Sequence, residues 1–216
     1  MSGRDGSSSE GSWKHLTDAK PTKQPDPPAP RAFLLQVTGR IESAEIFGAN
    51  DIYCKYNLAM GGDWAVTSGM EEAISQITSK NGDNVFVWNF PLEVTFKSTN
   101  PHGWPQLILS VYGADIMGNH IARGYGTTHF PVSKGVFTKI IPLFVPESSS
   151  FVQKISSWLM GRHPEFVDPK VLAQNDGRQV VRVESCGHVV VKMEMVTKDM
   201  AQLGYVTSDK VYNHDF

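Results

Sequence analysis

Histidines are the side chains of this sequence that could most readily share a metal ion. The seven histidines are spread along the chain, and no two stand at the i, i+2 or i, i+4 separations with which a strand or helix offers both rings to one metal. His120 and His129 are the one pair that a hairpin could bring together. This spacing favours ordinary surface or core histidines, and it predicts neither a metal site nor a cofactor.

Carboxylates in the loops raise the question of calcium, because some β-sandwiches bind calcium between their loops. Calcium needs six to eight oxygen ligands, which adjacent loops usually supply as pairs of carboxylates. Here the aspartates stand singly, although Asp63, Asp115 and Asp176 could converge at one end of a sandwich. Because no loop supplies a pair, the sequence predicts that calcium does not bind usefully.

Catalytic motifs are missing from the chain. It contains no Gly-x-Ser-x-Gly elbow, phosphate loop or dinucleotide fingerprint. Cys54 alternates with Ile52 and Tyr56, so it is predicted to be a buried and inert thiol. The second cysteine, Cys186, is too remote for a Cys-x-x-Cys motif, and two cysteines fit a reducing, cytoplasmic compartment. We expect a protein that is not an enzyme; a hydrolase assembled from distant residues is the catalytic alternative.

Two tryptophans in connecting segments are the strongest candidates for binding a partner. One lies in a loop flanked by prolines, and the other is followed closely by a methionine and an arginine, which are types enriched at protein interfaces. The alternative is that both rings fold inward and cap the core. The candidate partner-binding residues are Trp104, Trp158, Met160 and Arg162.

The elements that must carry these residues are strands, because apolar residues recur with a period of two. Three runs alternate clearly, at 52–58, 92–97 and 189–195, and each places one row of side chains inward. Gly, Pro and Asn turn signals separate the runs, which predicts an all-β antiparallel sandwich. Further strands are expected at 33–42, 85–90, 107–112, 121–130, 136–145 and 180–184.

One domain accounts for most of the 216 residues. Residues 1–31 are rich in Gly, Ser and Pro and are expected to be a disordered tail, residues 32–205 the folded domain, and residues 206–216 a C-terminal tail. One or two short helices are expected in connections, over 149–160 and from Asp168 onward. A net charge of −2 argues against a nucleic-acid partner.

Nine short segments occur in a fixed order along the chain: DIYCKY (51–56), ISQITSK (74–80), VWNFP (87–91), VTFKSTNP (94–101), GWPQ (103–106), LSVYG (109–113), RGYG (123–126), FVPES (144–148) and TKDM (197–200). Taken together, this series resembles the B9-domain family. The likeness runs from about Phe33 to Tyr205, and the segment before Arg31 is longer than the family leads us to expect.

This resemblance implies a C2-like β-sandwich and a non-enzymatic scaffold of the ciliary transition zone, just above the basal body of the ciliary cytoskeleton. It implies membership of the tectonic-like, Meckel-syndrome-associated complex, which supports cilium assembly and controls the entry of membrane proteins. The expected partners are other B9-domain proteins. The main alternative is a peripheral module that binds membrane phospholipid, as C2-like sandwiches often do.

Overall fold

The computed structural model describes residues 31–115, 117–146 and 183–205. These residues form strands that all pair antiparallel, together with a single short 3-10 helix, η3, at Ala201–Leu203. The strands are β1 (Phe33–Ile46), β2 (Asp51–Ala59), β3 (Trp64–Gly69), β4 (Glu72–Ile74), β5 (Thr78–Ser79), β6 (Val85–Ser98), β7 (Gln106–Ala114), β8 (His120–His129), β9 (Gly135–Pro146) and β10 (Val183–Lys198). The expected all-β antiparallel class is confirmed.

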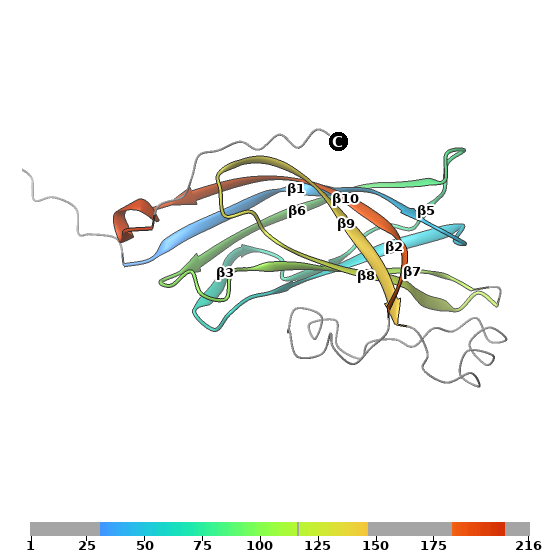
Figure 1. Ribbon diagram of the computed structural model, residues 1–216, viewed down its shortest axis with the longest axis horizontal. Coiled ribbons are helices and arrows are strands. Elements are labelled where there is room, and N and C mark those ends of the chain that lie inside the picture. Colours follow the sequence, from blue (N-terminus) through green and yellow to red (C-terminus); the bar gives the residue numbers. More distant parts are fainter. Residues whose placement is uncertain (1–30, 116, 147–182, 206–216) are drawn as a thin grey trace, which may run out of the picture.

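The strands form two packed sheets joined by one narrow connection. Their order is β3-β6-β1-β10-β9-β8-β7-β2-β4, with β5 also beside β2. Between β9 and β8 the register contains only one pair, Phe144 with Tyr125. In Figure 1, β1, β6 and β10 lie along one side of the molecule and β2, β7 and β8 along the other. The result is a sandwich whose inner faces meet in one core, as in other two-sheet antiparallel folds.

The alternating runs place the predicted side chains inward. The three inward rows are Ile52, Cys54, Tyr56 and Leu58; Leu92, Val94 and Phe96; and Val189, Val191, Met193 and Met195. Every member of these rows is at most 1% exposed and belongs to the main core. The rows come from both sheets, so their burial is what holds the two layers together.

The structure adds three strands that the sequence patterns do not predict. These are β3, β4 and β5, which are short and mostly exposed, so they lack an apolar alternation. It also joins two predicted strands into one, because β6 runs continuously through Pro91. Pro91 pairs with Arg40 of β1, whereas β3 pairs with β6 only from Val94 onward. The open side of β6 therefore accommodates a residue that has no N–H to donate.

Several expected elements fall outside the described residues. They include both tails, the helices over 149–160 and from Asp168, and residues 180–182 of the last short strand, whose remaining positions begin β10. Within the part of the chain that the structure describes, no helix is long and apolar enough to cross a membrane.

Candidate functional site

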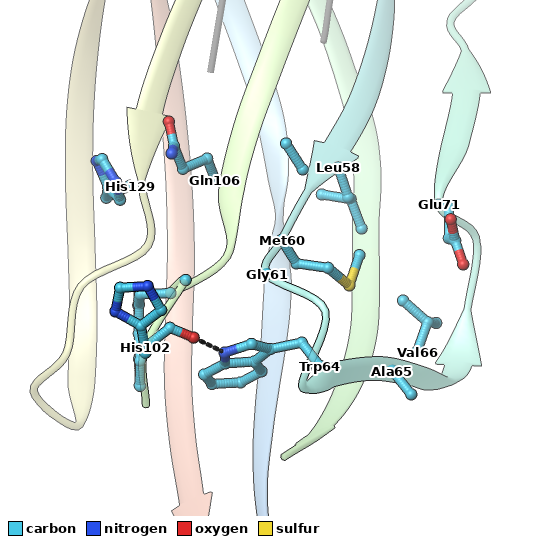
Figure 2. A pocket seen from close by; sticks show the side chains of 13 residues that line it. Leu58, Met60, Gly61, Trp64, Ala65, Val66, Glu71, His102, Gln106 and His129 are labelled. Carbon is cyan, nitrogen blue, oxygen red and sulfur yellow. Dashed lines mark hydrogen bonds between the residues drawn. The ribbon is translucent and has the colours of Figure 1, made fainter. Parts of the chain in front are cut away.

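A recess of about 850 Å³ opens at one end of the sandwich, where the turn after β2 meets the loop between β6 and β7 (Figure 2). Its floor and walls come from strands and loops that are far apart in the sequence. We call it the tryptophan recess, lined by Leu58, Ala59, Met60, Gly61, Trp64, Ala65, Val66, Glu71, His102, Gly103, Trp104, Gln106 and His129.

Trp64 is the buried wall of the recess. Its side chain is only 6% exposed, and its ring lies edge-on to Phe33, Phe96 and Trp104 with centroid distances of 5.4, 6.2 and 5.1 Å. Its indole N–H donates a 2.9 Å hydrogen bond to the His102 carbonyl, as Figure 2 shows. A buried indole needs such an acceptor, so this bond fixes the ring against the loop at 99–105.

The loop at 99–105 is held by side chains that bond to its backbone. Asn100 Oδ1 accepts a 3.0 Å bond from the His102 N–H, which makes a local turn. Ser98 Oγ accepts the Asn100 N–H at 3.1 Å and lies 2.9 Å from the Asp63 carbonyl. Pro101 and Pro105 further restrict the backbone. The loop is therefore preorganised, as the flanking prolines predicted.

Two glycines bring the turn after β2 against this loop. The Gly61 N–H donates a 2.9 Å hydrogen bond to the Gly103 carbonyl. Gly103 has a φ of +70°, and a Cβ built on it would lie 2.5 Å from the Gly61 Cα. Only glycine tolerates both this backbone conformation and this approach. The floor of the recess thus depends on a contact between two residues that are far apart in the sequence.

Trp104 is half-buried and belongs to this site. Its indole N–H donates a 2.9 Å hydrogen bond to the Phe130 carbonyl, and one side of its ring packs against the core. Trp104 thus both caps the sandwich and forms a wall of the recess, so the two alternatives for this residue are compatible in geometry. The other predicted anchors, Trp158, Met160 and Arg162, lie outside the described residues.

Most of the recess cannot be identified from the sequence. Gly61-Gly62 indicates only a turn, and no sequence pattern singles out Trp64 or Met60. The available signal was Trp64 itself, a large aromatic residue just after a double-glycine turn. In the sequence His102 is only one of seven dispersed histidines, because most of its neighbours in the recess come from other segments.

Among the described residues, the side-chain groupings considered for metals do not form, and Asp176 lies outside the described residues. Asp63 follows β2 and Asp115 follows β7, and because these strands are antiparallel the two carboxylates lie at opposite ends of the sandwich. Similarly, His120 and His129 stand at the two ends of β8 rather than across a hairpin. Among the described residues, no three His, Cys, Asp or Glu side chains are placed to hold a metal ion.

The two thiols sit in apolar surroundings. Burial raises the pKa of Cys54 from its ordinary 9.0 to about 12, and Cys54 is fully buried as predicted. The pKa of Cys186 is raised to about 11, mainly by burial. The negative charge of Glu184 raises it further. Because the thiolate is the reactive form, neither thiol is prepared for nucleophilic chemistry at neutral pH.

The recess is suited to accepting a side chain rather than to bond-making. Its lining combines two indoles and a methionine with the polar groups of Glu71, His102 and His129, and it includes no Ser, Thr, Cys or Lys nucleophile. Met70, which precedes Glu71 of the lining, is 61% exposed, and Ile74 and Ile77 further along the segment between β3 and β5 are 59% and 58% exposed. Aromatic pockets next to exposed apolar residues are typical of protein contact surfaces.

The described architecture defines an antiparallel β-sandwich with a preformed aromatic recess. Residues 35–196 match the family model B9-C2, described as "Ciliary basal body-associated, B9 protein". The chain belongs to this B9 family, and so to a family of ciliary proteins.

Curated relatives extend over most of the chain. B9 domain-containing protein 1 of Xenopus laevis is 59% identical, with 82% of this chain and 91% of that protein covered, and the human protein of that name is 57% identical, covering 83% and 89%. B9 domain-containing protein 2 of Xenopus laevis is 24% identical, covering 81% and 98%. Among solved structures, a C2 domain of plant Extended Synaptotagmin 1 aligns with a TM-score of 0.37 at 14% identity, covering 75% of this chain and 92% of that domain.

Proposed function

We propose that this protein is a non-enzymatic scaffold of the ciliary transition zone that acts by binding other B9-domain proteins. In this role it is a cytoplasmic component of the tectonic-like, Meckel-syndrome-associated complex above the basal body, and it contributes to cilium assembly and to the barrier for membrane proteins. Membership of a ciliary family supports the location, and the tryptophan recess supports the mode of action.

The observation that carries the proposal is that the recess is preformed. Its walls are fixed by hydrogen bonds from Trp64 to His102 and from Trp104 to Phe130, so a partner side chain that enters it meets rings already in place. Less ordering on binding means that more of the contact energy is kept as affinity. The exposed side chain of Met70, next in sequence to Glu71 of the lining, adds apolar surface to this part of the molecule. Trp158, Met160 and Arg162 are proposed as further anchors on the same chain.

The direct test is binding of recombinant B9 domain-containing protein 2 to this protein with the recess obstructed. Ala65 is exposed and lines the recess, so Ala65→Arg fills it with little expected effect on the core. We expect the variant to lower affinity by at least about 30-fold, the typical loss when one anchor contact is removed. Isothermal titration calorimetry measures it, and melting temperature shows that the fold is kept.

A matched control uses Ala114→Arg, because Ala114 is also an exposed strand alanine but lies at the opposite end of the sandwich. This variant should bind like the unmodified protein. Normal binding by Ala65→Arg would show that the recess is not the contact surface. If the unmodified protein binds no B9-domain protein, the scaffold function itself is wrong.

A second function, binding of membrane phospholipid, is favoured by one observation. Phe47 and Met117 are the two most exposed large apolar side chains of the described residues, at 84% and 69%. They lie in the β1–β2 and β7–β8 connections, which meet at the same end of the sandwich because β2 and β7 are antiparallel. Apolar loop tips at one end could enter a membrane interface.

Liposome sedimentation tests this second function. The protein should pellet with phosphatidylserine vesicles with or without calcium, and the Phe47→Asp/Met117→Asp double variant should remain in the supernatant. The Ile140→Asp variant is the control, because Ile140 is 64% exposed but lies on β9. No pelleting of the unmodified protein would exclude lipid binding as the function.

A further inference from the structure

The two indoles of the tryptophan recess have already used their hydrogen-bond donors. The Trp64 N–H donates to the His102 carbonyl and the Trp104 N–H to the Phe130 carbonyl, each at 2.9 Å. Trp64 is only 6% exposed, so the half-buried Trp104 is the indole that presents more of its ring to the recess. Because the indole N–H is the only polar group of a tryptophan side chain, these two residues offer an occupant aromatic surface and no free donor.

The charge in the lining of the recess is that of a carboxylate. Glu71 is the one acidic side chain of the lining, which contains two histidines but no Lys or Arg. The Glu71 side chain is exposed, so an occupant could reach it. In Figure 2, Glu71 lies across the recess from Trp64 and His102. The recess thus has aromatic surface on one side and an acidic group on the other.

The backbone beside β4 sets the direction of the Glu71 side chain. Its carbonyl accepts a 2.9 Å hydrogen bond from the N–H of Leu58, which lines the recess, whereas the next residue, Glu72, pairs with Asn57. Successive side chains of an extended chain point to opposite faces. Glu72 therefore lies on the far side from the recess, where it bonds to Asn57 Nδ2 at 2.9 Å and to Lys55 Nζ at 3.1 Å.

The carboxylate of Glu71 differs from that of Glu72 in having no internal cation. Among residues 31–115, 117–146 and 183–205, no side chain forms an ion pair or a hydrogen bond with it. Outside the lining, Lys97 is the cross-strand neighbour of Ala65, and Asp63 Oδ2 accepts a 3.3 Å bond from Asn100. These two flanking charges have opposite signs, so the lining itself sets the preference of the recess.

Arginine is the side chain whose chemistry matches this lining. Its planar guanidinium stacks on aromatic rings, carries five donors and no acceptor, and pairs with a carboxylate through two parallel hydrogen bonds. The ammonium of lysine is more strongly hydrated and has no plane to stack. An acidic side chain would meet the carboxylate of Glu71 and would find no indole donor.

We propose that the tryptophan recess binds an arginine side chain of a partner protein, with the guanidinium against Trp104 and paired with Glu71. This inference rests on the proposed scaffold function, because it names the side chain that the recess accepts from a partner. It is tested with peptides, so that its failure can be told apart from failure of the scaffold function.

The test uses four capped tripeptides, Gly-X-Gly, in which X is arginine, lysine, leucine or glutamate. Each is titrated into the isotope-labelled full chain, and NMR follows the indole N–H signals, of which the Trp104 signal is identified by its loss in Trp104→Phe. We expect the arginine peptide to shift the Trp104 signal and to bind at least about 10-fold more tightly than the leucine and glutamate peptides. No shift of this signal, or equal affinities for the peptides, would overturn the inference.

The role of the carboxylate is tested by Glu71→Gln, which removes the charge and keeps the size of the side chain. Affinity for the arginine peptide should fall at least about 3-fold, and affinity for the leucine peptide should stay the same. Glu45→Gln is the matched control, because Glu45 is also exposed but lies near the opposite end of the sandwich, beside the β1–β2 connection. Unchanged arginine affinity in Glu71→Gln would show that Glu71 does not hold the guanidinium.

The outcomes separate the arginine assignment from the scaffold function. If the arginine peptide binds as expected but no B9-domain protein does, the assignment holds and the scaffold function is wrong. If Ala65→Arg abolishes binding of B9 domain-containing protein 2 while the peptides show no preference for arginine, the recess is the contact surface and the assignment is wrong. Preference for the glutamate peptide would also overturn the assignment, and it would point to His102 and His129 as the binding groups.

Discussion

Trp104 meets Trp64 edge to face, with ring centroids 5.1 Å apart and an interplanar angle of 82°. Each indole N–H donates to a backbone carbonyl of a different loop, Trp64 to His102 and Trp104 to Phe130. The pair therefore connects the turn after β2, the loop before β7 and the end of β8. One aromatic contact thus helps to position three separate segments at this end of the sandwich.

Replacing Trp104 by alanine should lower the free energy of unfolding by about 2–3 kcal/mol, less than for a fully buried tryptophan because the ring is only half-buried. Urea denaturation of Trp104→Ala measures this change. Trp104→Phe is the control, since it keeps a ring against Trp64, and it should lose about half as much. A stability equal to that of the unmodified protein would show that the ring does not cap the core.

Gly103→Ala should destabilise the protein by about 2–3 kcal/mol, because it forces a non-glycine residue into a left-handed conformation and against Gly61. Gly62→Ala is the matched control from the same turn region, since a Cβ there meets nothing within 4 Å. The two variants are compared by thermal unfolding. Similar melting temperatures would contradict the close contact on which the floor of the recess depends.

Stability should fall at alkaline pH because of Cys54. The folded pKa of about 12 exceeds the ordinary value of 9.0, so below pH 9 both states keep the proton and the thiol adds no pH dependence. Between pH 9 and 12 only the unfolded chain loses the proton, and the unfolding free energy should drop by about 1.4 kcal/mol per pH unit.

The measurement is urea denaturation between about pH 8 and pH 10.5 for the unmodified protein and for Cys54→Ala. Both chains keep Cys186 and Tyr56, whose pKa values are also raised by burial, so the difference between the two slopes isolates Cys54. Parallel slopes would mean that Cys54 is accessible to water in the folded state.

Removal of residues 1–31 should leave the fold intact, because this segment has almost no apolar residues to bury. The melting temperature of the truncated chain should lie within about 4 °C of that of the full chain, a change of at most roughly 1–2 kcal/mol. A larger fall would show that the segment packs on the sandwich.

Alternation was the part of the fold that could be predicted from the sequence. Val94 and Phe96 of β6, like Met193 and Met195 of β10, are buried because a strand turns every second residue to the same side. β3 could not be predicted in this way. Only Trp64 is buried among its six residues, and its position is set by pairing with the end of β6.

The recess was harder to predict, because it depends on contacts between distant segments. Pro101 and Pro105 indicated a stiff loop around Trp104, and the structure confirms that this loop is ordered by local hydrogen bonds. Nothing in the local sequence indicates that Gly61 touches Gly103 or that Trp64 lies against Trp104. The unbroken apolar run Leu107–Leu109 did carry a signal for a strand buried on both faces.

The first and last strands of the domain are neighbours, with Leu34 opposite Lys198 in an antiparallel pair. Both ends of the domain therefore leave from the same pole, where Tyr205 contacts Phe33. Tension applied through the two ends would peel β1 from β10 one hydrogen-bonded pair at a time, instead of loading all the pairs together in shear. In a large assembly under mechanical strain, this domain would resist force best when the load passes through its sides and not along its chain.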